Sequence, residues 1–243
     1  MTERTIEFVK CSVQDGVWHI CIDRPEKRNA LTMPMFAAIA DALKAADQRD
    51  DVRSILVTGT GNVFCAGHDL KSFEEWPQQS QDPVPIFLHT IADVRKPVVI
   101  AAHGSATGIG VTWLLHADWV VTSVDSVFRL PFIDLGIVPE AASTLLLQRA
   151  IGFSRAKRLL LGGEKFTGAE AYQWGLVAEL SSNAEVYGRA LERAKFLASK
   201  DPVILRCIKD WLHPSSEYHR RIDEEVIEIN AAVGRSRKAT EVI

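Results

Sequence analysis

A glycine-rich turn between two apolar stretches is the part of the sequence best suited to hold a negatively charged group. Val98–Ala102 is a short β-branched run typical of a buried strand, and Val111–Ala117 has the length and apolarity of a buried helix. Gly104, Gly108 and Gly110 separate them, and glycine lets a ligand approach the backbone closely. The first N–H groups of a helix have no partner within it and carry the positive end of its dipole. The turn is therefore a candidate anion or oxyanion site, and the plain alternative is a tight turn.

Two carboxylates stand in the apolar stretch that follows. Glu140 comes directly after Val138-Pro139, at the expected start of a helix, and Asp134 precedes it in the same stretch. Apolar neighbours raise the pKa of a carboxyl group by desolvation, whereas a helix N-terminus acts against that rise. Glu140 is thus a candidate acid or base, and the alternative is a residue that only complements a helix dipole. Asp134 is the competing acid, or a turn or interface residue.

The histidines and cysteines do not have the spacing of a metal site. His103 and His116 flank the predicted buried helix without a suitably spaced third ligand, and we expect both to be hydrogen-bonded structural residues. The cysteines are scattered and too few for a disulfide scaffold, so we expect reduced thiols in a cytoplasm-like compartment. They are Cys11, Cys21, Cys65 and Cys207.

The composition is that of an ordinary globular enzyme. The 243 residues are 47% hydrophobic and 24% charged, with a formal net charge of −3. This balance lacks the basic field that drives binding to nucleic acid, so we expect no nucleic-acid partner. The sequence shows no membrane-spanning run, no apolar leader and no peroxisomal C-terminal tripeptide. We therefore expect a cytoplasmic protein with no membrane association.

Strands and helices alternate through the first three quarters of the chain, which predicts an α/β fold. A hairpin with Asp15-Gly16 at its tip opens the chain, and Thr167–Glu170 is a capping box before a short helix. The stretch 71–85 is polar and proline-rich and is predicted to be a surface loop. The other expected strands are 6–11, 17–23, 54–58, 119–122, 127–129 and 177–180, and the other expected helices are 32–46 and 86–95.

From Asn183 onward the pattern is helical, with cap signals at Asn183, at Asp201 before Pro202, and at Ser216. We expect two parts: residues 1–182 as the core that carries the site, and residues 183–243 as a helical C-terminal region.

Four motifs, in order along nearly the whole chain, resemble the crotonase (enoyl-CoA hydratase/isomerase) superfamily. They are R-P-E-K-R-N-A-L-T at 24–32, F-C-A-G-H-D-L at 64–70, G-S-A-T-G-I-G at 104–110, and the stretch from G-F-S-R-A-K to W-G-L-V at 152–177. The resemblance implies a spiral of ββα units and a helical C-terminal region that packs a homotrimer, often a dimer of trimers. It also implies an acyl-CoA thioester substrate, with CoA as part of the substrate and with no metal and no redox cofactor.

The same resemblance implies roles for individual residues. The N–H groups of Ala66 and Ile109 would form the oxyanion hole that holds the thioester oxygen, and fixed backbone donors stabilise an enolate there. Gly67, His68, Asp69 and Leu70 would line the CoA site. Lys27, Arg28 and Ala30 would lie at the nucleotide end of CoA, where cations suit phosphates; without the resemblance, Lys27 and Arg28 are typical of a solvated charged loop.

The resemblance also indicates which reaction to expect. Hydratases of this family carry glutamates at the positions of Thr112 and Phe132, and neither is a carboxylate here. Addition of water needs that water to be held and deprotonated, which Thr and Phe do poorly. Glu140 instead matches the single base of Δ3,Δ2-enoyl-CoA isomerases, so we expect an isomerase. The alternatives are a hydratase, another enolate-forming enzyme of the family, and a catalytically silent acyl-CoA-binding protein.

Overall fold

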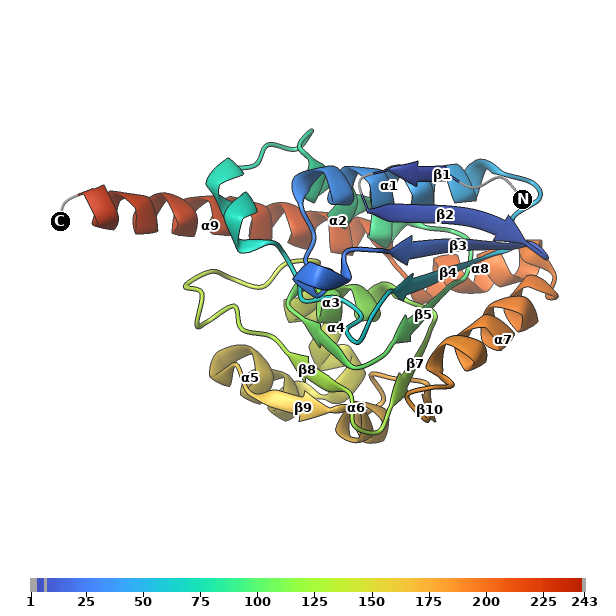
Figure 1. Ribbon diagram of the computed structural model, residues 1–243. Coiled ribbons are helices and arrows are strands. Elements are labelled where there is room, and N and C mark those ends of the chain that lie inside the picture. Colours follow the sequence, from blue (N-terminus) through green and yellow to red (C-terminus); the bar gives the residue numbers. More distant parts are fainter. Residues whose placement is uncertain (1–3, 7, 242–243) are drawn as a thin grey trace.

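The computed structural model describes residues 4–6 and 8–241, and a seven-stranded sheet is its central feature (Figure 1). The strand order is β1-β2-β3-β4-β5-β7-β10. The pairs β1–β2 and β2–β3 are antiparallel, and every later pair in the sheet is parallel. These strands are β1 (Arg4–Ile6), β2 (Val9–Gln14), β3 (Val17–Ile22), β4 (Ser54–Gly59), β5 (Val98–Ala102), β7 (Trp119–Ser123) and β10 (Glu179–Ser181).

Both faces of this sheet are buried, which explains why its central strands are apolar throughout. Alternate residues point to opposite faces, so Ile55 and Val57 of β4 join one core cluster while Leu56 joins the other. The larger cluster includes α1 (Met33–Gln48) and α2 (Pro83–Asp93), and the smaller one includes α7 (Val186–Ala198).

A second, three-stranded sheet lies to the left of β7 and β10 in Figure 1 and carries the turn of interest at one edge. It contains β6 (Ser105–Thr107), β8 (Val127–Arg129) and β9 (Lys165–Thr167), in the order β6-β8-β9. Directly after β6, the chain forms α3 (Ile109–Thr112) and the 3-10 helix η3 (Trp113–His116). The other short 3-10 helices are η1 (Pro25–Lys27) and η2 (Leu70–Glu75).

The remaining helices follow along the chain. They are α4 (Ser143–Ile151), α5 (Phe153–Gly162), α6 (Gly168–Trp174), α8 (Pro202–Leu212) and α9 (Ser215–Glu241). Figure 1 shows α9 running past the body of the protein, with its C-terminal end extending beyond the other elements.

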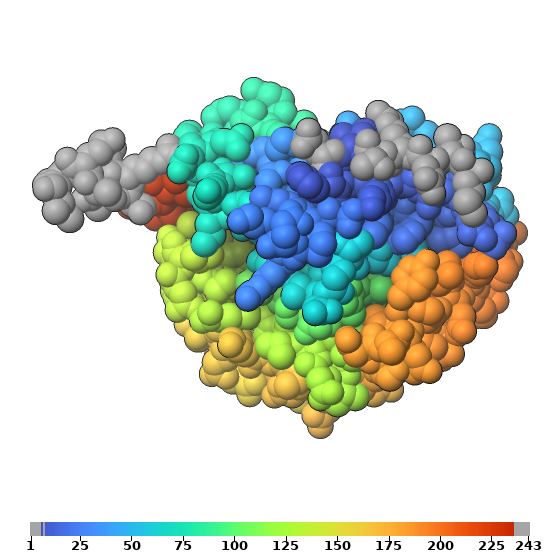
Figure 2. Space-filling view, viewed as in Figure 1, coloured from blue at the N-terminus to red at the C-terminus, as the bar shows by residue number. Residues whose placement is uncertain are grey.

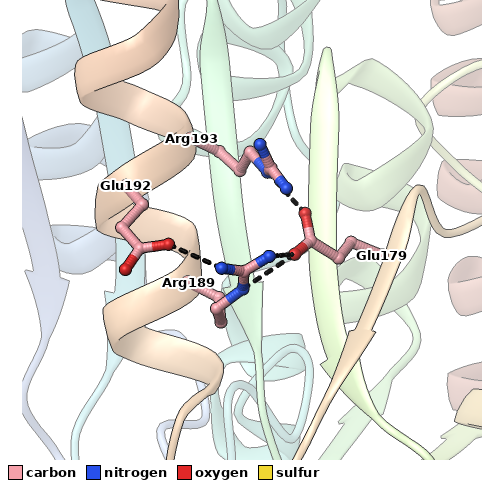
Figure 3. A network of polar contacts seen from close by, with 4 residues as sticks. All are labelled: Glu179, Arg189, Glu192 and Arg193. Atoms are coloured by element: carbon pink, nitrogen blue, oxygen red, sulfur yellow. Dashed lines mark hydrogen bonds and ion pairs between the residues drawn. The ribbon is translucent and has the colours of Figure 1, made fainter.

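Ion pairs fix α7 to the edge strand β10 (Figure 3). Arg189 Nη2 and Arg193 Nε lie 2.6 and 2.5 Å from the two carboxylate oxygens of Glu179. The Arg193 hydrogen bond, with that of Arg189, holds the pKa of Glu179 below its ordinary value. Since α7 also covers one face of the sheet, this first helix of the C-terminal region packs as part of the core.

Most predicted elements are confirmed, including the hairpin at Asp15-Gly16, the capping box at Thr167–Glu170 and the Asp201 cap. Other predictions are corrected. The helix predicted at 111–117 is α3 followed by a 3-10 turn, the last strand is Glu179–Ser181, and the predicted loop 71–85 contains η2 and the start of α2. The caps predicted at Asn183 and Ser216 are also wrong, because α7 begins after Glu185 and α9 begins at Ser215. In the part of the chain that the structure describes, no helix is long and apolar enough to cross a membrane.

Candidate active site

Two loops, each following a strand, lie against each other and form the base of the site. The loop after β4 bonds to β6, since Thr107 N donates to the Cys65 carbonyl over 3.0 Å. Two glycines permit this approach: a Cβ at Gly67 would lie 2.7 Å from the Thr107 oxygen, and one at Gly110 would lie 2.6 Å from the Cys65 oxygen. The turn predicted from Gly108 and Gly110 is therefore packed directly on the F-C-A-G-H-D-L loop.

The backbone donors of these loops do not match the expectation fully. Ala66 N donates to the Arg28 carbonyl over 2.9 Å, so its N–H group is not free to hold a substrate oxygen. The N–H groups of His68 and Ile109, by contrast, donate to no acceptor among the described residues. His68 and Ile109 also line one pocket together. The expectation for Ala66 is therefore wrong in geometry, and among the described residues the N–H groups of His68 and Ile109 are the ones left free to donate into this pocket.

The correction follows from how the loop is paired. Leu31 N donates to the Gly67 carbonyl and Asp69 N donates to the Leu31 carbonyl, both over 2.8 Å. In this parallel bridge between Leu31 and His68, the N–H of His68 points away from the strand that contains Leu31. The Ala66 N–H points instead to the Arg28 carbonyl, and Gly67, between the two residues, has a φ of 97° that turns the backbone.

The His68 side chain serves as an aromatic wall. Its ring lies 4.6 Å from that of Phe73 and 5.0 Å from that of Phe36, centroid to centroid. Burial lowers the pKa of His68 to about 4, so the imidazole is neutral at pH 7. His68 Nε2 is buried without a hydrogen-bond partner among the described residues.

Glu140 faces this pocket from a tight turn just before α4. The helix begins at Ser143, so Glu140 stands outside it and not at its first residue as predicted. Thr112 Oγ1 donates to Glu140 Oε1 over 3.0 Å, whereas Glu140 Oε2 has no partner among the described residues. One carboxylate oxygen is therefore held and the other is free to meet a substrate.

The surroundings of Glu140 favour its neutral form. Desolvation by burial raises the pKa of Glu140 to about 8, the hydrogen bond from Thr112 opposes the rise, and the charge of Glu225 adds to it. A carboxyl group with a pKa near the working pH can both accept and return a proton. The expected rise in pKa is thus present, with Ile109, Ile137 and Ile229 as the aliphatic neighbours in the pocket.

The pocket is narrow and almost closed. Its free volume is about 10 Å³, roughly the space of one water molecule. Glu140 is its only acidic lining residue; the others are Phe36, His68, Phe73, Trp76, Val84, Ile109, Ile137 and Ile229. An adjacent groove of about 420 Å³ shares Phe73 and Ile137 with it and opens to the surface beside Leu70 and Val233. An acyl group can enter only if the pocket widens.

The segment 70–78, which contains η2, closes the pocket and is held against α9 by hydrogen bonds. Gln78 N donates to Asn230 Oδ1, and Asn230 Nδ2 donates to the Gln78 carbonyl, each over 2.8 Å. Figure 2 shows this segment, in teal, lying beside the red part of α9. Two residues of the segment, Phe73 and Trp76, stack at 5.9 Å over the pocket.

Asp134 and Phe132 do not join Glu140. The Asp134 carboxylate is exposed and pairs with Arg129 Nη2 at 2.9 Å, away from the pocket lining. Phe132 is buried and packs near Gly108, behind the turn. Asp134 is therefore not positioned to compete with Glu140 as the acid of this pocket. Phe132 packs against the turn at Gly108.

The residues expected near CoA form a continuous rim. Arg24 Nη1 donates to the Ala30 carbonyl over 2.9 Å and to Asp69 Oδ2 over 2.7 Å, which ties the first motif to the second. Lys27, Arg28 and Leu70 are exposed on this rim. The Lys27 and Arg28 side chains thus face solvent, and Asp69 supports the loop, accepting also from Lys71 N.

The two histidines flanking the turn are structural, as predicted. His103 Nε2 is 3.0 Å from the Gly61 carbonyl and His116 Nε2 is 2.8 Å from the Ala141 carbonyl. The described residues contain no cluster of three or more potential metal ligands, and their four cysteines are free thiols.

Sequence reasoning missed several residues that build the site. Asn29 is fully buried with φ of 56° and donates to the carbonyls of Thr60 and Val63. Glu225, on α9, accepts a hydrogen bond next to Glu140. A signal for Glu225 exists, because it interrupts the apolar row of Ile222, Val226 and Ile229 on a helix.

Comparison with known proteins gives a consistent result. The family model described as enoyl-CoA hydratase/isomerase matches residues 12–241. The chain is 31% identical to the 1,2-epoxyphenylacetyl-CoA isomerase of Escherichia coli K12 over 216 residues, which cover 86% of this chain and 82% of that protein. It is 33% identical to the peroxisomal enoyl-CoA delta isomerase 3 of Mus musculus, covering 82% of this chain and 65% of that protein.

Solved structures agree with these relatives. An enoyl-CoA hydratase/isomerase from Pseudoalteromonas atlantica T6c superposes with a TM-score of 0.89 at 33% identity, covering 93% of this chain and 92% of that chain. Proteins named as hydratases are as similar in sequence as those named as isomerases. The reaction must therefore be argued from the residues of the site.

Proposed function

The chain belongs to the enoyl-CoA hydratase/isomerase family, with its crotonase-type α/β fold and its acyl-CoA thioester substrates, and we propose that it is an isomerase. It moves the double bond of a 3-enoyl-CoA from C3–C4 to C2–C3, and Glu140 carries the proton. The observation that carries this proposal is the single carboxylate in the pocket, beside two unpaired backbone N–H groups.

In the first step, Glu140 Oε2 removes a proton from C2 of the bound thioester. The C–H electron pair moves into the C1–C2 bond, and the thioester oxygen takes the negative charge of a dienolate. The N–H groups of His68 and Ile109 hold that oxygen, and each such donor contributes about 3–4 kcal/mol to the transition state. Thr112 keeps the carboxylate in place through Oε1.

In the second step, the protonated Glu140 returns its proton to C4. The dienolate electrons move back, so that the C2–C3 double bond and the thioester carbonyl form and the carboxylate is regenerated. A pKa of about 8 suits both steps, because the carboxyl group gains its proton readily and still releases it near neutral pH.

Several features support this reaction over hydration. Thr112 and Phe132 occupy the two hydratase glutamate positions, so neither position supplies a carboxylate to hold and deprotonate a water molecule. A silent binder would have no need of a carboxylate with a free oxygen at the pocket. We further place the CoA nucleotide along Lys27, Arg28 and Ala30, and the protein in the cytoplasm, where its four thiols stay reduced.

The test uses two substrates and one variant. Purified protein receives a 3-enoyl-CoA and, separately, a trans-2-enoyl-CoA, and the conjugated thioester and the 3-hydroxyacyl product are followed. We expect conjugated product from the first substrate and little hydration of the second. Glu140→Gln should lose isomerisation at least about 10³-fold while it still binds the acyl-CoA. Turnover by the variant, or efficient hydration by the wild type, would refute the proposal.

A further inference from the structure

The turn that carries Glu140 has an unusual backbone. Ala141 and Ala142 have φ angles of 61° and 53°, in the left-handed region. Two consecutive alanines rarely adopt that conformation, because their Cβ atoms crowd the following carbonyl oxygen. The surrounding structure must therefore hold this turn, since its own residues favour a different backbone.

A single peptide group is held at both ends. His116 Nε2 donates to the Ala141 carbonyl over 2.8 Å, and Ala142 N donates to Glu225 Oε2 over 2.7 Å. The carbonyl and the N–H belong to the same peptide bond, and both contacts are buried. Two side chains from η3 and α9 thus prevent this peptide from rotating.

Glu225 holds this peptide from a buried position on α9. It is 5% exposed and lies in the buried row of Ile222, Val226 and Ile229, where an apolar residue would be ordinary. Its other oxygen, Oε1, accepts from Thr144 Oγ1 over 3.0 Å, and Arg221 Nη1 donates to the same hydroxyl over 3.2 Å. Both oxygens of the buried carboxylate are therefore used on the residues that follow Glu140.

We propose that Glu225 is a positioning residue that, together with His116, locks the Ala141–Ala142 peptide and so aims Glu140 at the acyl pocket. This inference rests on the proposed function, in which Glu140 carries the proton. It also links the pocket to α9, because Ile229, one turn after Glu225, lines the pocket itself.

Glu225 also shares the electrostatic surroundings of Glu140. Cys65 faces Glu140 from the loop after β4, and burial raises the pKa of its thiol to about 12. His68 and His116 have pKa values lowered to about 4 by burial, so both are neutral. Burial raises the pKa of Glu225 to about 7, with Arg221 opposing the rise. Among these groups, Glu225 alone gains charge in the range in which Glu140 ionises.

The experiment compares Glu225→Ala with Glu225→Gln, and Glu228→Gln on the exposed face of α9 is the matched control. Glutamine keeps an oxygen for Ala142 N–H, so we expect kcat within about threefold of wild type. Alanine releases the peptide, so we expect kcat to fall at least about tenfold with KM little changed, because misplacement acts on the chemical step. The control should match the wild type. Unchanged kcat in Glu225→Ala, or equal losses in both variants, would overturn the proposal.

A second readout does not depend on which reaction the protein catalyses. In protein labelled with carbon-13 at glutamate Cδ, the resonance lost in Glu140→Gln reports the titration of Glu140. Removal of the Glu225 charge should move that titration to lower pH in Glu225→Gln, and the rising limb of kcat/KM should move with it. If the titration of Glu140 does not move in Glu225→Gln, the electrostatic coupling between Glu225 and Glu140 is refuted. This result holds even if Glu225→Ala fails to fold. Absence of wild-type turnover together with the shifted titration would refute only the proposed function.

Discussion

At the scale of single residues, the choice of the oxyanion donor turns on one hydrogen bond. Ala66 and His68 stand in the same short motif, but only the N–H of Ala66 has a protein acceptor, the Arg28 carbonyl. A motif aligned by residue type does not say which of its N–H groups points outward. That direction is set by pairing with Leu31, which is distant in sequence.

Replacement of one backbone amide by an ester separates the two residues. An ester in place of the amide N–H of residue 68 should lower kcat about 10²–10³-fold, because it deletes a donor to the dienolate oxygen. The same change at residue 66 should lower thermal stability, through the lost bond to Arg28, and leave kcat nearly unchanged. Steady-state kinetics of the two esters decide the matter, and a larger kcat loss at residue 66 would restore the original assignment.

The raised pKa of Glu140 has a consequence for stability. Its ordinary pKa is 4.5 and its value in the folded protein is about 8. The folded state therefore favours the protonated carboxyl, and this advantage is complete below pH 4.5 and lost as the pH rises through 8. Glu140→Gln does not titrate. We expect its free energy of unfolding, relative to wild type, to increase between pH 5 and 9 by on the order of 2–4 kcal/mol.

Thermal unfolding of wild type and Glu140→Gln at pH 5, 7 and 9 measures this difference. Asp134→Asn is the control, because the Asp134 side chain is exposed and lies outside the pocket. A difference between Glu140→Gln and wild type that stays constant with pH would mean that Glu140 ionises normally.

The sequence alone identifies Glu140 as a candidate acid or base, because it is a carboxylate in an apolar stretch that matches a motif. It did not reveal that Thr112 donates to Glu140, because Thr112 was considered only as a missing glutamate. The apolar row on α9 marks Glu225 as unusual, but the sequence does not show what it contacts. Its contact with Ala142 joins segments far apart in the chain, and local patterns carry no information about such pairs.

At the scale of elements, the segment that contains η2 covers the pocket. Trp76 is 3% exposed and closes the pocket together with Phe73, and the Gln78–Asn230 hydrogen bonds hold the segment against α9. The sequence predicted a surface loop here because of its prolines and polar residues. Its aromatic residues, packed inward, make it instead a wall of the site.

Replacement of a large aromatic side chain in this segment should change which substrates the protein prefers. Trp76→Ala enlarges a pocket of about 10 Å³, so the ratio of kcat/KM for longer over shorter 3-enoyl-CoA substrates should rise at least about tenfold. The lost burial should lower the free energy of unfolding by about 3–5 kcal/mol. Glu75→Ala, exposed in the same segment, is the control. An unchanged ratio would show that the acyl chain does not pass Trp76.

The strand, glycine turn and helix around Gly108 were predicted correctly in kind, but the helix is short. α3 ends at Thr112 and a 3-10 turn follows, because η3 must bring His116 under the Glu140 turn. Apolar periodicity cannot distinguish these two helical forms.

At the scale of the whole molecule, α8 presents an apolar face that the other residues described by the structure leave exposed. Trp211 is 84% exposed, and Val203, Ile204, Ile208 and Leu212 are exposed on the same helix. Soluble proteins rarely leave such a patch bare, so we expect it to pack against other copies of the chain in a trimer or a dimer of trimers.

Light scattering after size exclusion should give a mass of three or six times 26.9 kDa. The double variant Ile204→Glu, Trp211→Glu should be monomeric, because it places charges in the interface. Phe153→Glu, exposed on α5, is the control. A monomeric wild type at micromolar concentration would contradict the expected assembly.

In the proposed reaction, one carboxylate in a narrow pocket moves the proton from C2 to C4. The most direct measurement uses a 3-enoyl-CoA with deuterium at both C2 positions, turned over in ordinary water, with mass spectrometry and NMR of the product. If Glu140 carries the proton without exchange with solvent, a measurable fraction of the product has deuterium at C4. Glu140→Gln should give no product. Wild-type turnover that leaves no deuterium at C4 would contradict the account.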